Sequence, residues 1–373
     1  MSPPSASATP ADDGPQWQIG IPAWRVDVGR EIDLIEEVAR HYGYDRLVST
    51  FPPLLQPPAP LSPYQRRQRL LHRVLTSGGC SEAINFSFAD RTSTAPFVQD
   101  ESDLVGIANP LSEQFTVLRP SLLPDLLDSL VRNRRREQRD IRLFEIGKRF
   151  RRTTGETLGI AIAIAGGGAP EHWSAPARPV DLCDIKGLVE RTCEALGAIP
   201  LFERTVSRVL VTGRASSVTG ISRSTGEQVS LGIFGQLTPT ITTNRGFPNT
   251  GDEVYVAELD LLALAAVAAD RNRLHVTPVP RYPSVVRDLA LIVDGTLPAA
   301  AVRDTIQTVA PDTRVSVREF DHYVGLGVPD GYVSLALRLT FRASDRTLTA
   351  LEVQAAVAAV VAALRDQHGA TLR

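Results

Sequence analysis

Four carboxylates stand close together in the stretch "DVGREIDLIEEVAR", which runs from Asp27 to Arg40. Asp33, Glu36 and Glu37 are three and four positions apart, so a helix would place them on one face, and Asp27 precedes that helix closely enough to fold back onto it. Hard divalent cations such as Mg²⁺ take oxygen ligands from such clusters, commonly one or two carboxylates and several waters. The other interpretation is a solvated acidic helix whose Asp33 lies near the favourable N-terminus.

A short strand and a helix are predicted to position these acids. The stretch "WQIGIPAWRVDV", residues 17–28, alternates in polarity as a strand does. The following "EIDLIEEVARHYGYD" has Ile35, Val38 and Tyr42 on one helical face and Gly43 near its end. One strand and one helix make a poor core, so we expect this segment to need packing partners.

The composition of the 373 residues excludes several classes of protein. A formal net charge of -2 gives no global basic field, so any contact with RNA must be local. The three cysteines form no CxxC pair, which argues against a zinc site or a disulfide framework and predicts a cytoplasmic location. No apolar run approaches the roughly 20 residues that span a bilayer, so no membrane contact is expected. Residues 1–16 are predicted to be a flexible tail.

The remaining pattern predicts an α+β chain. A proline-rich linker, residues 51–63, cannot continue a helix and is expected to be extended. Residues 64–270 then mix helices such as "YQRRQRLLHRVLTSGG" with strands such as "IRLFEIGKRF" and "LGIAIAIAGG", and a second linker, residues 271–278, follows.

Residues 279–373 are predicted to fold in the order βαββαβ. This is the ferredoxin-like arrangement, in which two helices cover one face of an antiparallel sheet and leave the other face free to bind a partner. Arg338, Arg342 and Arg346 come at even spacing along one strand and its exit, which favours a common face.

The sequences of several stretches, and the order in which they occur, resemble the C-terminal half of the bacterial phenylalanyl-tRNA synthetase β subunit. The stretches that carry the resemblance include "PAWRVDVGREIDLIEEVARHYGYD", "NPLSEQFTVLRPSLLPDLL", "LFEIGKRF", "RYPSVVRDLALIVD", "FDHYVGLGVPDGYVSLALRLTFRASDRTLT" and "GATLR". They occur in family order and cover nearly everything after residue 17.

The resemblance implies three structured parts. Residues 17–50 would be the remnant of a winged-helix-like, B5-type module, residues 64–270 a non-catalytic class II aminoacyl-tRNA-synthetase-like core of antiparallel sheet and helices, and residues 279–373 the ferredoxin-fold anticodon-binding domain. The core holds no G-x-G-x-G-x-R stretch or comparable phosphate cradle, and the glycines of "AGGGAP", residues 165–170, are better explained by a turn.

The resemblance also implies an α2β2 phenylalanine–tRNA ligase. Its α subunit would bind ATP, activate phenylalanine and charge tRNA(Phe), while this chain would have no catalytic residue and no activity alone. Four acids match the family pattern D-x5-D-x2-E-E of a Mg²⁺ site shared with the α subunit: Asp27, Asp33, Glu36 and Glu37.

Arginines and tyrosines of the C-terminal domain are candidates for RNA contact, since arginine pairs with phosphate and both side chains stack on unpaired bases. The candidates are Arg281, Arg287, Tyr323, Arg338, Arg342 and Arg346. Local ion pairs, Arg287 with Asp288 and Arg346 with Asp345, are the alternative for two of them.

The chain also departs from the family pattern. The OB-fold and editing domains that precede this region in the family, and the first half of the B5-type module, are not in this sequence, and Val211, Thr212 and Gly213 replace a His-Pro-Gly-like turn. The alternatives are a stand-alone RNA-binding or regulatory paralogue that has lost the synthetase partnership, or a fragment with no role of its own.

Overall fold

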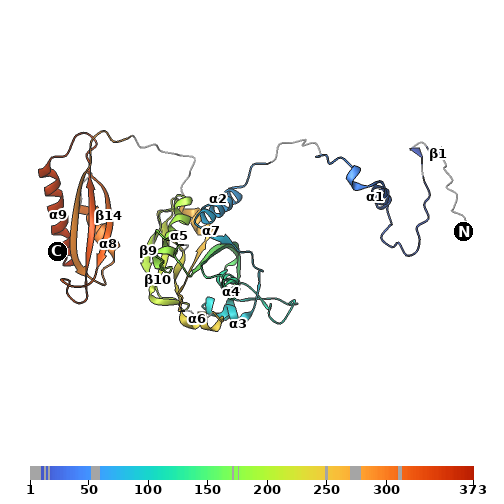
Figure 1. The fold of residues 1–373 in the computed structure, drawn as a ribbon, viewed down its shortest axis with the longest axis horizontal. Coiled ribbons are helices and arrows are strands. Elements are labelled where there is room, and N and C mark those ends of the chain that lie inside the picture. The colour runs from blue at the N-terminus through green and yellow to red at the C-terminus, as the bar shows by residue number, and fades with distance from the viewer. Residues whose placement is uncertain are drawn as a thin grey trace. The chain divides into compact units, whose positions relative to one another are not determined.

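The computed structural model describes residues 10–11, 14–15, 17–51, 59–169, 172–174, 176–247, 251–268, 279–309 and 313–373. The chain divides into two compact units, Met1–Ala269 and Asp270–Arg373 (Figure 1). Apart from the two-residue strands β1 (Pro10–Ala11) and β2 (Gly14–Pro15), the predicted tail lies outside the described residues. So do residues 52–58 of the first predicted linker and all of the second.

The acidic segment forms helix α1 (Glu31–Tyr42), followed by the 3-10 helix η1 (Tyr44–Arg46). The helix ends at Gly43, whose φ of 101° favours glycine. The strand predicted for residues 17–28 is wrong, because this stretch forms two turns instead. Pro22 accepts the backbone N–H of Arg25, and Arg25 accepts that of Val28, so the backbone groups pair locally.

The first unit is built on a seven-stranded sheet in the order β3-β7-β8-β12-β11-β10-β9. Neighbouring strands are antiparallel except for the parallel pair of β3 and β7. The strands are β3 (Ser81–Glu82), β7 (Ile141–Arg151), β8 (Gly155–Ala165), β9 (Leu201–Arg204), β10 (Leu210–Ile221), β11 (Gln228–Leu237) and β12 (Val254–Asp260). A smaller sheet contains β4 (Phe88–Ala89), β5 (Val105–Gly106) and β6 (Val117–Leu118).

Helices cover both faces of the seven-stranded sheet. Successive side chains of a strand point to opposite faces, and here both sets are apolar and buried. Ile160, Ile162 and Ile164 pack under one set of helices, while Ala161 and Ala163 contact the other. The first set is α2 (Pro63–Ser77), α5 (Leu182–Ala195) and α7 (Leu261–Val267); the second is α4 (Leu123–Arg134) and α6 (Pro239–Asn244). The remaining α-helix among the described residues of this unit is α3 (Arg91–Thr94), which is a single turn long.

The second unit has the predicted βαββαβ order. Its elements are β13 (Val285–Asp294), α8 (Ala299–Val309), β14 (Arg314–Tyr323), β15 (Tyr332–Phe341), α9 (Ala350–His368) and β16 (Thr371–Leu372). The strands form an antiparallel sheet in the order β14-β15-β13-β16. Leu291, Leu337 and Leu339 are buried with Val302 of α8 and Val360 of α9, so both helices pack on one sheet face. The predicted α+β class and ferredoxin-like domain are confirmed.

Candidate RNA-binding face and acidic helix

The sheet of the second unit has an outer face that α8 and α9 do not cover. Strand register decides which residues lie there: Asp288 is opposite Arg338, and Ser334 is opposite Tyr323. Because Leu337 and Leu339 are buried against the helices, the intervening Arg338 projects to the other side. We call this surface of β13, β14, β15 and β16 the outer face.

One cluster on the outer face joins Phe320, Arg338 and Asp288. The Arg338 guanidinium lies 5.1 Å from the centroid of the Phe320 ring. Its Nε and Nη2 donate to the two carboxylate oxygens of Asp288 at 2.8 and 2.7 Å. This ion pair lowers the pKa of Asp288 below its ordinary value. Phe320 is 50% exposed, so the cluster presents an aromatic ring to solvent.

A second cluster joins Tyr323, Arg373 and Ser334. The Arg373 guanidinium lies 4.9 Å from the Tyr323 ring centroid, and its Nη1 donates to Ser334 Oγ at 3.4 Å. The backbone N–H of Arg373 donates to the carbonyl of Ala290 at 3.0 Å, which fixes the residue at the β16 edge of the sheet. Ser334 is buried although it belongs to the outer face, because these side chains extend over it.

The other sequence candidates are not all on this surface. Arg287 is opposite Leu339 in the register and therefore points to the helix-covered side, away from Asp288. Arg346 comes after β15 has ended, and it donates to Asp345 at 3.0 Å and to Glu352 at 2.8 Å at the start of α9. Its even spacing from Arg338 therefore says nothing about a shared sheet face.

Two candidates adjoin the ends of strands. Arg281 precedes β13, so strand alternation does not fix its direction. Arg342 follows β15, and its backbone N–H donates to the carbonyl of Thr313 at 2.6 Å. No observation tests RNA contact for any of the six candidates, which stay predictions.

Two residues of the outer face were missed by sequence reasoning, Phe320 and Arg373. Register between β14 and β15 shifts here: Glu319 is opposite Leu337, and Asp321 is opposite Ala336, so Phe320 is an extra residue in β14. Such a bulge breaks the alternation from which faces are read. Nothing in the sequence around Arg373 indicates that it lies on the outer face, because its position depends on a strand partner that is distant in the sequence.

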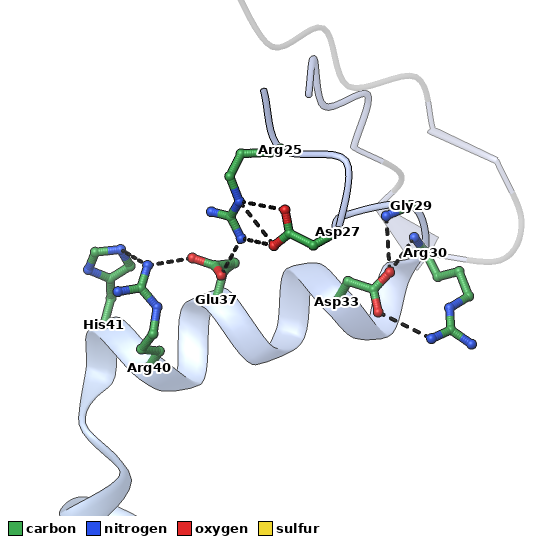
Figure 2. A network of polar contacts seen from close by, with 8 residues as sticks. All are labelled: Arg25, Asp27, Gly29, Arg30, Asp33, Glu37, Arg40 and His41. Atoms are coloured by element: carbon green, nitrogen blue, oxygen red, sulfur yellow. Dashed lines mark hydrogen bonds and ion pairs between the residues drawn. The ribbon is translucent and has the colours of Figure 1, made fainter. Parts of the chain in front are cut away.

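The acidic helix places an arginine among the predicted metal ligands (Figure 2). Arg25 Nη2 donates to Asp27 Oδ2 at 2.7 Å and to Glu37 Oε1 at 2.6 Å. Arg40 donates to the other Glu37 oxygen at 2.6 Å. The hydrogen bond from Arg25 and the smaller contribution of the one from Arg40 lower the pKa of Glu37 to about 2. The hydrogen bond from Arg25 also lowers the pKa of Asp27.

The other two acids are engaged differently. Asp33 Oδ2 accepts the backbone N–H groups of Gly29 and Arg30 at 3.0 and 2.8 Å, which begins the helix and lowers the pKa of Asp33. The Glu36 side chain is exposed and has no hydrogen bond or ion pair among the described residues. In the part of the chain that the structure describes, no three acidic, histidine or cysteine side chains are grouped as a metal ion requires. The arrangement therefore does not fit a bound Mg²⁺.

Two arginines near the sheet of the first unit, Arg119 and Arg149, are already paired. Arg119 is buried and donates to Glu145 at 2.7 Å and to the carbonyl of Lys148 at 3.0 Å. Arg149 donates to Asp260 at 2.6 Å. These guanidinium groups are held by the protein itself, so gripping a phosphate would require breaking a buried or half-buried ion pair.

The glycine stretch at residues 166–168 is likewise bonded internally. Gly167 N–H donates to the Asp140 carboxylate at 2.6 Å, and Gly168 N–H donates to the carbonyl of Arg178 at 2.8 Å. The stretch borders a cavity of about 500 Å³ whose polar lining includes Ser81 and Arg142. Gly167 forms an isolated β-bridge with Pro179, and the Asp140 carboxylate already accepts its N–H, so this N–H is not free for a phosphate.

Three family models match the chain, and all describe parts of tRNA synthetases. The ferredoxin-fold anticodon binding domain matches residues 280–373, the tRNA synthetase B5 domain residues 6–44, and the phenylalanyl tRNA synthetase beta chain CLM domain residues 47–261. The last match alone covers more than half of the sequence. The chain belongs to the phenylalanyl-tRNA synthetase β chain family, and the resemblance read from the sequence is confirmed.

Curated relatives agree with the family models. The phenylalanine–tRNA ligase beta subunit of Dechloromonas aromatica is 33% identical over 376 residues, which cover 97% of this chain and 45% of the relative. That of Bacillus subtilis is 34% identical over 362 residues, covering 95% and 44%. The chain thus spans about half the length of the curated relatives it matches. Among solved structures, a pyrrolysyl-tRNA synthetase of Desulfitobacterium hafniense matches with a TM-score of 0.39 and 18% identity, over 63% of this chain and 75% of that one.

No helix within the described ranges is long and apolar enough to cross a membrane.

Proposed function

We propose that this chain acts as the β-chain component of a phenylalanine–tRNA ligase, in which it pairs with an α subunit and contacts tRNA(Phe). The observation that carries the proposal is the outer face, where two arginine–aromatic clusters lie in a domain that matches the anticodon-binding family. Aromatic rings stack on unpaired bases, and arginine adds charge and stacking, so this surface suits a single-stranded RNA loop.

The proposed role of residues 64–270 is that of a scaffold. Arg119 and Arg149 are bonded to carboxylates, and the glycine stretch is closed by Asp140, which supports a chain that does not bind ATP itself. Activation of phenylalanine with ATP and Mg²⁺ is assigned to the α subunit of a cytoplasmic α2β2 assembly. Residues 17–50 would be a B5-type module and residues 279–373 the anticodon-binding domain.

Metal binding by Asp27, Asp33, Glu36 and Glu37, which the family resemblance implies, is not part of this proposal. The arrangement of Arg25 and Arg40 in this chain opposes it. We therefore assign no step of the proposed reaction to a metal at this helix.

Co-expression with a phenylalanyl-tRNA synthetase α subunit tests the proposed function. We expect the two chains to co-migrate in size-exclusion chromatography with light scattering, and the purified complex to charge tRNA(Phe). The chain alone is expected to show no phenylalanine-dependent ATP–pyrophosphate exchange. Separate elution together with tRNA binding by the chain alone would instead favour a stand-alone RNA-binding protein. Exchange activity in the pure chain would contradict the scaffold role.

A further inference from the structure

The position of Arg25 carries an inference about the acidic helix that does not depend on the ligase function. Its Nε donates to both oxygens of Asp27, at 3.0 and 3.1 Å, and its Nη2 donates to Asp27 and to Glu37 at 2.7 and 2.6 Å. One guanidinium thus joins two carboxylates that are ten positions apart in the chain (Figure 2). The Arg25 and Glu37 side chains are only 24% and 26% exposed.

Arg25 reaches this position because of the turns that replace the predicted strand. The carbonyl of Arg25 accepts the N–H of Val28, so residues 25–28 turn and Asp27 lies beside the Arg25 side chain. Helix α1 then presents Glu37 to the same guanidinium.

Oxygens of Glu37 and Asp33 also have partners, whereas the Glu36 carboxylate has none among the described residues. Arg40 bonds the second oxygen of Glu37, while backbone N–H groups of Gly29 and Arg30 bond Asp33. A divalent ion such as Mg²⁺ requires oxygen ligands at about 2.0–2.1 Å in near-octahedral geometry. A cation at that distance from Asp27 and Glu37 would compete for the same lone pairs and be repelled by the positive guanidinium.

We infer that Arg25 is the cation of this cluster: it neutralises Asp27 and Glu37, orders residues 25–37, and keeps divalent ions off both carboxylates while its guanidinium is in place. The charges support this role, since Arg25, Arg30 and Arg40 all bond acids of the cluster. The helix therefore needs no bound metal in order to join the preceding turn.

Two measurements on the full chain test this inference. In the first, chymotrypsin cleavage after Tyr42 and Tyr44 is followed by mass spectrometry for the wild type and for Arg25→Gln. Arg30→Gln is the matched control, because the Arg30 side chain is 80% exposed and makes a long contact of 3.4 Å with Asp33. We expect cleavage of Arg25→Gln to be roughly threefold faster or more, as expected for the loss of an ion-pair network, and cleavage of the control to be unchanged. Equal rates in the two variants would overturn the ordering role.

The second measurement is Mn²⁺ binding, followed by electron paramagnetic resonance with Mn²⁺ as the probe ion. We expect the wild type and Asp27→Asn to bind Mn²⁺ alike, since Arg25 already excludes the ion from this carboxylate. A wild-type site whose affinity falls tenfold or more on Asp27→Asn would show that a metal, and not Arg25, neutralises the cluster. Chymotrypsin protection that rises with Mn²⁺ in the wild type would overturn the inference in the same way.

Discussion

The guanidinium of Arg373 lies 4.9 Å from the ring of Tyr323, although the two residues belong to opposite edges of the C-terminal sheet. Arg373 follows β16, Tyr323 ends β14, and β13 and β15 lie between them. The arginine side chain therefore extends across the outer face and lies on the surface that we assign to RNA.

Replacing Arg373 by glutamine should weaken binding of tRNA(Phe) about five- to a hundredfold, the range expected from losing one stacking contact and one charge. Fluorescence anisotropy with labelled tRNA measures the change. Arg365→Gln is the control, because Arg365 is an exposed arginine of α9 paired with Asp366. Equal losses in both variants would indicate a general charge effect and remove Arg373 from the interface.

Phe320→Ala should lower tRNA affinity by about 1–3 kcal/mol, since base–aromatic stacking contributes about that amount per base. Phe320→Tyr keeps the ring and should restore most of the affinity. Leu351→Ala removes an exposed apolar side chain from α9 and should leave binding unchanged. If Phe320→Ala binds like the wild type while its thermal unfolding is unaltered, base stacking on this ring is wrong.

Asp288→Asn should strengthen RNA binding. The substitution removes the carboxylate that accepts hydrogen bonds from Nε and Nη2 of Arg338. The guanidinium stays beside the Phe320 ring. One freed arginine that contacts phosphate should make the slope of log affinity against log salt steeper by about 0.7 for single-stranded RNA. A titration of affinity against potassium chloride measures this slope, with Asp294→Asn as control because Asp294 bonds Thr296 in its own turn. Weaker binding by Asp288→Asn would mean that RNA requires the ion pair intact.

Asp125→Asn should stabilise the first unit at pH 8 and have little effect at pH 4. Burial raises the pKa of Asp125 to about 7, and its Oδ2 is buried with no hydrogen-bond partner among the described residues. A raised carboxyl pKa means that the folded state favours the neutral form of Asp125. The resulting contribution of Asp125 to the free energy of unfolding is fully present below the unfolded pKa near 4, and it is lost as pH rises through about 7.

The expected gain from Asp125→Asn at pH 8 is up to about 4 kcal/mol, because a carboxyl pKa raised from near 4 to about 7 means that the folded state binds the proton roughly a thousandfold more tightly than the unfolded state. Urea unfolding at pH 4, 6 and 8 measures it. Asp128 lies on the same helix as Asp125, and Asp128→Asn, which breaks its ion pair with Arg245, should destabilise the unit instead. A constant difference between Asp125→Asn and the wild type at all three pH values would contradict the titration of Asp125.

Much of the architecture could be predicted, because strong periodicity determines it. Leu289, Leu291 and Val293 alternate with exposed or half-buried positions in β13, and this is the pattern from which the βαββαβ domain was expected. Helix α1 was also expected, since it has a clear apolar face and ends at Gly43.

The errors and omissions concern residues whose environment depends on contacts distant in sequence. Residues 17–28 alternate in polarity, but they form turns because their backbone groups pair within the segment. Arg25 was not expected beside Glu37, since nothing in its local sequence indicates that a turn brings the two together. Likewise the bulge at Phe320 has no sequence signature, and Arg287 was included without the strand register that directs it to the helix-covered side.

The bulge in β14 also affects how two copies of the chain can meet. Strand β14 is an edge of the sheet, and a regular edge offers a row of free N–H and C=O groups to which another strand can add. The extra residue at Phe320 interrupts that row and bends the strand. The same irregularity that turns an aromatic ring toward solvent therefore disfavours edge-to-edge pairing, which lets the domain expose an apolar ring with less risk of aggregation.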